Sequence, residues 1–349
     1  ISFDTVVEEA SDNARLEGVE VINAGDGNDV VDLTSDTIAY GDVTINGGSG
    51  ADTLWGNEGD DTIRGELGDD NIHGGAGDDY LDGGYGDDEM DGGVGNDTML
   101  GGTGEDILRG GAGDDTIVGG ADIDTVMYDD ATEGVDVNLA NYTATGGAGN
   151  DAIYQVENVT GSNHDDTITG DHKANILDGG AGDDTLVGGA GNDTLRGGEG
   201  NDTADYSAAT APVTANLTTG TAQVGASETD KLNSIENLIG SAGNDTLTGS
   251  DADNTLMGGL GNDTLIGNGG NDVLEGGAGD DVLDGGEGDD TVNGGDGSDV
   301  INAGAGNDTV DGGAGNDRLI GYTACLSTRC VGGPCARFSI STVIASTLR

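Results

Sequence analysis

The chain has 349 residues, of which 71 are glycine, and its 68 acidic residues against 10 lysines and arginines give a formal net charge of −58. A chain this negative repels phosphate groups, which excludes a nucleic-acid-binding protein. Only 3% of the residues are aromatic and 33% are hydrophobic, so an ordinary hydrophobic core cannot hold the chain together. We therefore expect a fold that depends on something other than apolar burial.

Residues 1–46 are predicted to form an irregular β segment that caps the rest of the chain, because the end of a repetitive fold needs a different face from its interior. Strand-like runs occur at Thr5-Val6-Val7, Val19-Glu20-Val21-Ile22 and Val43–Ile45. Between the last two runs, Ala24–Asp32 is one degenerate copy of the repeat that follows, with Asp29 at its acidic position.

From residue 47 to residue 127 the sequence repeats a nine-residue unit, glycine-glycine-x-glycine-x-aspartate-x-apolar-x, and Gly74–Asp82 is a typical copy. The first six positions favour a turn, because the three glycines allow positive φ and bring carbonyl oxygens close together. The sixth position adds a carboxylate, which is Asp79 in this copy. The last three positions predict a short strand whose eighth residue, Leu81, points inward while its two neighbours point outward.

One such turn supplies only part of the roughly six to eight oxygen ligands that Ca²⁺ takes, and two stacked turns complete the set. The repeat resembles the RTX (hemolysin-type calcium-binding) family over roughly 300 residues. The resemblance implies an all-β fold, a right-handed parallel β-roll solenoid in which two nonapeptides make one coil. Each unit then stacks on the unit two places along, with the metal between their turns.

Three blocks of nine, five and nine units predict the number of metal ions. If each unit pairs with the unit two along, the blocks hold about 17 Ca²⁺ ions, which would cancel over half of the negative charge. Without calcium we expect the chain to stay open, because its carboxylates repel one another and its glycine-rich backbone loses much entropy on ordering. Calcium binding is then what drives folding.

The predicted metal ligands of the first roll, residues 47–127, are its sixth-position aspartates. They are Asp52, Asp61, Asp70, Asp79, Asp88, Asp97, Asp106, Asp115 and Asp124. The last unit has Asp122 in place of a glycine, so Asp124 belongs to the least regular of these predicted sites.

Residues 128–160 and 206–239 interrupt the repeats and are copies of one another. Both contain strictly alternating segments that predict half-buried strands, Val135/Val137/Leu139 and Val213/Ala215/Leu217. Each also contains one bent nonapeptide. Asp151 is a predicted ligand in the first copy, whereas the second, around Asp230, has Glu228 in place of a glycine. Inserts between RTX rolls form wider β coils, so we interpret both as structural parts of a continuous solenoid.

The second roll, residues 161–205, and the third, residues 240–320, repeat the pattern. Their predicted aspartate ligands are Asp166, Asp184, Asp193, Asp202, Asp245, Asp263, Asp272, Asp281, Asp290, Asp299, Asp308 and Asp317. The second unit of each roll has asparagine instead, Asn175 and Asn254, and a neutral amide lowers the charge of a site, so these two are left out. Second- and fourth-position glycines of regular units are the predicted carbonyl ligands: Gly75, Gly77, Gly84, Gly86, Gly93, Gly95, Gly180, Gly182, Gly189, Gly191, Gly259, Gly261, Gly277, Gly279, Gly286 and Gly288.

The tail, residues 321–349, contains all three cysteines and no acidic residue. The spacing of Cys325, Cys330 and Cys335 does not fit a zinc site, and an odd number leaves one thiol unpaired. RTX chains normally contain almost no cysteine, so the tail is either an artefact such as a frameshift or a capping or cross-linking element. Alternation over Phe338–Ile344 would suit a strand on the last coil.

We predict that this chain is not an enzyme. Its histidines, His73, His164 and His172, form no His-Glu-x-x-His motif, and no Gly-x-Ser-x-Gly sequence occurs. Carboxylate pairs are abundant, as in a glycosidase, but nearly all belong to turns that metal binding explains better. Trp55 and Tyr80 occupy outward positions, where surface cover is a simpler interpretation than a platform for sugars.

The predicted function is calcium binding by a secreted module that folds on its ions and acts as a rigid folding and secretion scaffold. Alternatives are the non-catalytic repeat part of a larger secreted hydrolase or epimerase, or an adhesin or polysaccharide-binding spacer. The resemblance implies type I secretion machinery as a partner and an extracellular location in a Gram-negative bacterium, where calcium is millimolar. Extracellular polysaccharide and the cell surface are further candidate partners, and no apolar run approaches the roughly 18 residues of a membrane span.

Overall fold

The structure is a computed structural model that describes residues 21–34 and 41–322. Within these ranges the regular secondary structure consists of β-strands, and the described residues contain no helix. No helix in this described part of the chain is long and apolar enough to cross a membrane. The predicted strand at Thr5-Val6-Val7, the three cysteines and the alternating segment Phe338–Ile344 lie outside the described residues.

The chain divides into two compact units between Thr185 and Leu186. The strands of the first unit are β1 (Val21–Asp26), β2 (Val30–Asp32), β3 (Thr44–Ser49), β4 (Thr53–Trp55), β5 (Thr62–Leu67), β6 (Asn71–Ala76), β7 (Tyr80–Tyr85), β8 (Glu89–Val94), β9 (Thr98–Thr103), β10 (Ile107–Ala112), β11 (Thr116–Ala121), β12 (Thr125–Met127), β13 (Val135–Asn138), β14 (Thr143–Gly146), β15 (Gly149–Tyr154), β16 (Asn158–Thr160), β17 (Thr167–Thr169) and β18 (Ile176–Ala181). Strand β19 (Thr185–Val187) lies at the division. The strands of the second unit are β20 (Thr194–Glu199), β21 (Thr203–Asp205), β22 (Val213–Asn216), β23 (Thr221–Val224), β24 (Glu228–Asn233), β25 (Asn237–Ile239), β26 (Thr246–Thr248), β27 (Thr255–Leu260), β28 (Thr264–Gly269), β29 (Val273–Ala278), β30 (Val282–Glu287), β31 (Thr291–Gly297), β32 (Val300–Ala305), β33 (Thr309–Asp311), β34 (Ala314–Gly315) and β35 (Arg318–Tyr322).

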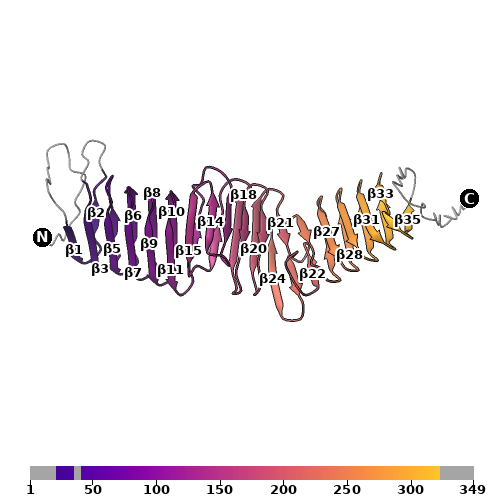
Figure 1. Cartoon of the computed structure of the whole chain (residues 1–349), viewed down its shortest axis with the longest axis horizontal. Coiled ribbons are helices and arrows are strands. Elements are labelled where there is room, and N and C mark those ends of the chain that lie inside the picture. The colour runs from indigo at the N-terminus through magenta and orange to yellow at the C-terminus, as the bar shows by residue number, and fades with distance from the viewer. Residues whose placement is uncertain (1–20, 35–40, 323–349) are drawn as a thin grey trace, which may run out of the picture. The chain divides into compact units, whose positions relative to one another are not determined.

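Within each unit the repeat strands pair in parallel with the strand two places along the chain, as Figure 1 shows for successive coils. In the first unit β5 pairs with β7, with Ile63 opposite Leu81. In the second unit β28 pairs with β30, with Leu265 opposite Leu283. Where the repeats run without interruption, as from β5 to β7, paired residues of neighbouring coils are 18 apart, which is two nine-residue units. The structure thus confirms the predicted parallel β-roll.

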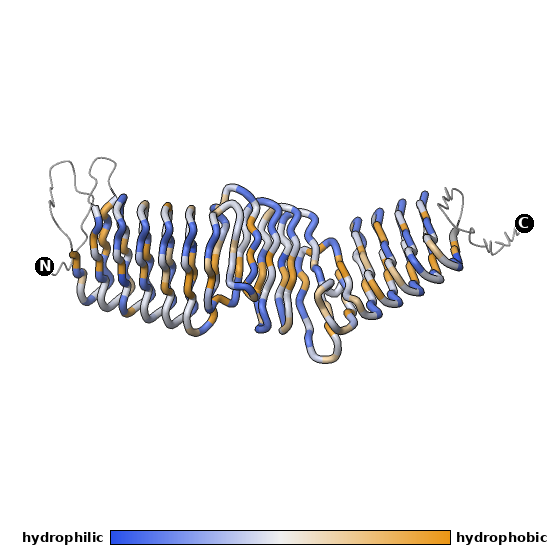
Figure 2. The backbone as a smooth tube through the Cα atoms, in the orientation of Figure 1, coloured by the Kyte–Doolittle hydropathy of each residue, from blue (hydrophilic) through white to orange (hydrophobic). Residues whose placement is uncertain are grey.

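The interior of each coil is formed by the eighth residue of every repeat unit. Ile72 in β6 and Leu81 in β7 are both 0% exposed. Figure 2 shows such apolar positions recurring once per strand in successive coils. Because one large apolar side chain is buried for every nine ordered residues, burial alone leaves much of the conformational entropy of folding uncompensated.

The two inserts add antiparallel strands, which the sequence did not predict. In the first unit β13, β14 and β15 form an antiparallel meander, and its outer strands then join the coils in parallel, β15 to β11 and β13 to β17. In the second unit β22, β23 and β24 repeat this arrangement, with β24 beside β20 and β22 beside β26. The alternating segments form β13 and β22, so each insert widens a coil without ending the stack.

Candidate metal centre

The glycine turns concentrate main-chain carbonyl oxygens between neighbouring coils. Gly75 and Gly77 have φ of 115° and 136°, a region that residues with a Cβ rarely adopt. A Cβ at Gly93 would lie 2.1 Å from Gly75 O, and one at Gly95 would lie 1.8 Å from Gly77 O. The second- and fourth-position carbonyls of one turn therefore face the next turn, where a Cβ in place of these glycines would overlap them. All of the glycines predicted as carbonyl ligands have positive φ.

Three non-glycine residues hold the same turn conformation. Glu66 and Asn268 stand at second positions with φ of 76° and 78°, and Asp122 stands at a fourth position with φ of 84°. The departure noted at Asp122 thus keeps a positive φ at the fourth position of its turn. The carbonyl oxygens of these turns depend on backbone conformation more than on strict glycine identity.

The sixth-position aspartates point their carboxylates into the same gaps. Asp97 is 1% exposed, and its Oδ1 accepts a hydrogen bond from the Asp79 N–H of the preceding coil at 2.7 Å. Its Oδ2 is buried without a hydrogen-bond partner. The same unpartnered Oδ2 occurs in Asp52, Asp70, Asp79, Asp88, Asp106, Asp115, Asp124, Asp263, Asp272, Asp281, Asp290 and Asp299.

An inter-turn gap therefore holds the oxygens that a hard cation requires. Between the turns of residues 74–79 and 92–97 lie the carbonyl oxygens of Gly75 and Gly77 and the carboxylate of Asp97. The described residues contain no group of three or more His, Cys, Asp or Glu side chains suited to a metal. Carbonyl and carboxylate oxygens in a flexible arrangement suit Ca²⁺, and the unpartnered Asp97 Oδ2 is a negatively charged oxygen to which the cation could bind.

Burial perturbs these carboxylates. It raises the pKa of Asp79, Asp88 and Asp97 to about 7. In the second unit it raises the pKa of Asp263 and Asp272 to about 6. The first cause is loss of water, and neighbouring carboxylates add to it, although backbone N–H groups oppose the shift. A bound cation would remove this penalty.

In four of the predicted ligands, Oδ2 accepts a hydrogen bond and is not left without a partner. Asn57 donates from Nδ2 to Asp61 Oδ2 at 2.9 Å. Tyr128 donates from its hydroxyl to Asp151 Oδ2 at 2.9 Å. The main-chain N–H groups of Ser162 and Ser241 donate to Oδ2 of Asp166 and Asp245. The remaining predicted aspartates, Asp184, Asp193, Asp202, Asp308 and Asp317, are buried.

The sequence pattern missed a second ladder, at the fifth position. Asp78 Oδ1 accepts a hydrogen bond from Asn96 N–H at 2.8 Å, and Asn96 Oδ1 accepts one from Asp114 N–H at 2.9 Å. In the third roll Asn262 Oδ1 accepts from Asp280 N–H in the same way. This exposed ladder runs opposite to the buried sixth-position one. Its signal is the frequent Asp or Asn at a position that the repeat formula leaves open.

Replacing a turn glycine should break the stack locally. A Cβ at Gly279, where φ is 147°, would lie 1.6 Å from Gly261 O. We expect Gly279→Ala to cost about 2–4 kcal/mol in thermal unfolding followed by circular dichroism in calcium. Gly269→Ala is the matched control, because a Cβ there meets nothing closer than 3.8 Å. Equal stability of the two variants would contradict the role of the carbonyl stack.

The fold and these turns define a β-solenoid with an oxygen-lined gap between successive coils. The model of the RTX calcium-binding nonapeptide repeat matches more than half of the chain, at residues 16–36, 41–72, 64–99, 91–126, 173–204, 233–265, 257–292, 266–301 and 293–322. The chain therefore belongs to the RTX calcium-binding repeat family, whose repeats bind calcium. A search of curated proteins finds no match to it.

Proposed function

We propose that this chain is a secreted scaffold whose rolls fold when Ca²⁺ fills the gaps between coils. The observation that carries the proposal is the row of buried, unpartnered Oδ2 atoms, such as that of Asp97, in a chain of net charge −58. Each such oxygen is costly to bury as an anion and becomes favourable once a divalent ion sits beside it. Folding and calcium binding are then one process.

The scaffold works outside the cell. Calcium is scarce in the cytoplasm, so a chain of this kind stays extended there and passes type I secretion machinery before it folds. Membership of the calcium-binding repeat family supports this location. The folded rolls then supply length and rigidity, with extracellular polysaccharide or the cell surface as the contacts, and the chain itself performs no catalysis.

A single charge tests the role of the sixth position. Asp97→Asn keeps an acceptor for Asp79 N–H but removes the negative charge from its gap. We expect the variant to bind one ion fewer, or to bind that ion at least about tenfold more weakly, in equilibrium dialysis with elemental analysis. The wild-type count in the same experiment tests the prediction of about 17 ions.

Asp78→Asn is the matched control, because Asp78 is exposed and its Oδ1 accepts from Asn96 N–H on the outer ladder. This control removes the same single charge, but from the fifth position of a repeat unit in the neighbouring coil and not from the sixth. Calcium binding equal to wild type in both variants would contradict the proposed site, whereas a loss in Asp97→Asn alone supports it.

A further inference from the structure

In each insert a buried tyrosine donates a hydrogen bond to an aspartate Oδ2, the atom that has no partner in regular repeat units such as that of Asp97. Tyr128 is 1% exposed and donates its hydroxyl proton to Asp151 Oδ2 at 2.9 Å. Asp151 Oδ1 accepts the usual ladder hydrogen bond from Asp115 N–H at 3.0 Å. Both oxygens of Asp151 are thus satisfied by the protein, in contrast to those of Asp97. Tyr128 makes unnecessary the cation that an inter-coil carboxylate otherwise requires.

The second insert repeats this contact with different surroundings. Tyr206 is 5% exposed and donates to Asp230 Oδ2 at 3.1 Å, while Asp230 Oδ1 accepts from Asp193 N–H at 2.9 Å. The unit that contains Asp230 has Glu228 where the repeat has glycine, and the Glu228 carbonyl oxygen already accepts a hydrogen bond from Gln223 Nε2. The Tyr206–Asp230 hydrogen bond occurs in a unit that departs from the repeat, so it replaces the metal there as a stabilising contact.

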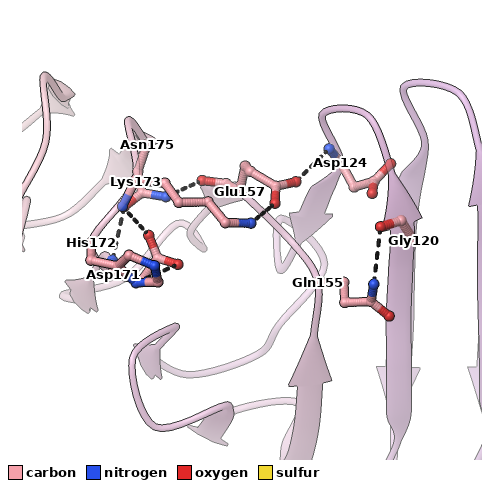
Figure 3. Close-up of polar contacts among 8 residues, drawn as sticks. All are labelled: Gly120, Asp124, Gln155, Glu157, Asp171, His172, Lys173 and Asn175. Atoms are coloured by element: carbon pink, nitrogen blue, oxygen red, sulfur yellow. Dashed lines mark hydrogen bonds and ion pairs between the residues drawn. The ribbon is translucent and has the colours of Figure 1, made fainter.

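Protein groups also occupy the next gap of the first unit (Figure 3). Glu157 Oε2 accepts from Asp124 N–H at 3.2 Å, in the place that a sixth-position aspartate fills elsewhere. Lys173 Nζ forms an ion pair with the other oxygen of Glu157. Asn175 Nδ2 donates to Glu157 O at 2.7 Å. Glu157 is therefore paired with an ammonium group at its carboxylate and with an amide at its main-chain oxygen, whereas Asp97 in a regular gap has a carboxylate oxygen without a partner.

The second unit shares most of this arrangement. Glu236 Oε2 accepts from Asp202 N–H at 2.9 Å, and Asn254 Nδ2 donates to Glu236 O at 2.8 Å. After each insert, a serine hydroxyl donates to the first sixth-position aspartate of the roll that follows. In the first unit the Ser162 hydroxyl donates to Asp166 Oδ1 at 2.9 Å. The corresponding serine hydroxyl of the second unit contacts Asp245 Oδ1 at 2.8 Å. The two inserts, which are copies of one another in sequence, and the rolls that follow them thus contain matching hydrogen-bond donors.

We propose that these contacts make each insert a calcium-independent joint, which stays folded without Ca²⁺ and from which the neighbouring rolls grow. The first joint comprises Tyr128, Asp151, Glu157, Lys173 and Asn175, and the second comprises Tyr206, Asp230, Glu236 and Asn254. The inference rests on the proposed calcium-driven folding of the rolls. In a stack where each coil contacts only its neighbours, an existing coil removes the cost of starting the next one. Asp151 is then a structural residue and not a calcium ligand.

Amide hydrogen exchange of the full chain in chelator at pH 7.5, followed by mass spectrometry, tests the joints. We expect peptides within residues 135–160 and 213–239 to exchange at least about tenfold more slowly than peptides within the rolls, such as residues 62–100. Equal exchange in inserts and rolls would overturn the inference. The rolls report separately on the proposed function, which fails if their protection is the same in chelator and in calcium.

Removal of one hydroxyl gives the sharper test. Tyr128→Phe leaves Asp151 Oδ2 without its donor, so in chelator the first insert should lose its protection while the second, with Tyr206, keeps it. Tyr206→Phe should give the reverse pattern. Tyr142→Phe is the control, because Tyr142 is 53% exposed and stacks on Tyr154. Unchanged protection of the first insert in Tyr128→Phe would overturn the assignment, and spectra in saturating calcium show that each variant still folds.

Discussion

In chelator at neutral pH, most of the β signal in the far-UV circular dichroism spectrum should be lost, and addition of Ca²⁺ should restore it in a cooperative transition. The physical reason lies in aspartates such as Asp88 and Asp97, which are 1% exposed and have an unpartnered oxygen. Desolvating an ionised carboxylate is expensive, and the rolls contain a row of them with little apolar core to compensate. Without the ions, charge repulsion favours the open chain.

Magnesium at the same concentration is the control for this experiment. Mg²⁺ requires a tight octahedral shell and gives up its water reluctantly, whereas the gaps offer flexible carbonyl oxygens such as those of Gly75 and Gly77. We expect Mg²⁺ to restore little of the signal. A spectrum that is the same in chelator and in calcium would show that the coils hold together without metal, and the proposed function would then fail.

The nine-residue period predicted the strands and the inward residue at the eighth position of each unit, Ile72 or Leu81 for example. The pairing of each strand with the strand two units along was implied by the resemblance to the RTX family, and the structure shows it. The glycines in the turn predicted carbonyl oxygens between coils, since a Cβ at Gly95 would overlap Gly77 O. Local chemistry and the repeat length therefore agree, which is why register and site positions follow together.

What the sequence left hidden are contacts without a period. Tyr128 and Asp151 are 23 residues apart and meet only because the insert folds back through the antiparallel strand β14. Asn57 resembles an ordinary turn residue, yet its amide reaches Asp61 Oδ2. Neither contact follows from residue spacing, because each depends on where a side chain points after the coils have stacked. The predicted ligands Asp61 and Asp151 consequently look regular in sequence and differ from Asp97 in structure.

Protons should partly replace calcium in folding the rolls. Burial raises the pKa of Asp79, Asp97 and Asp115 to about 7, whereas an aspartate in an unfolded chain has a pKa of about 3.9. Between these values the folded calcium-free chain binds more protons than the unfolded chain, so its stability rises as pH falls. The gain is complete below the unfolded pKa and is lost as pH rises through about 7. We expect the β signal in chelator to increase between about pH 7.5 and about pH 5.

The calcium titration should respond to pH in the opposite direction. An ion that enters a gap must displace the proton of its aspartate, so the calcium concentration at the midpoint should rise by up to about tenfold for each pH unit below the pKa. Asp114, an exposed fifth-position residue, does not mimic this effect, because hydrogen bonds from Asn150 lower its pKa. A midpoint that is the same at about pH 7.5 and about pH 6 would contradict the assignment. Opposite signs in chelator and in calcium are expected only if proton and metal compete for the same buried oxygen, so the pair of measurements locates the driving force of folding at the sixth-position carboxylates.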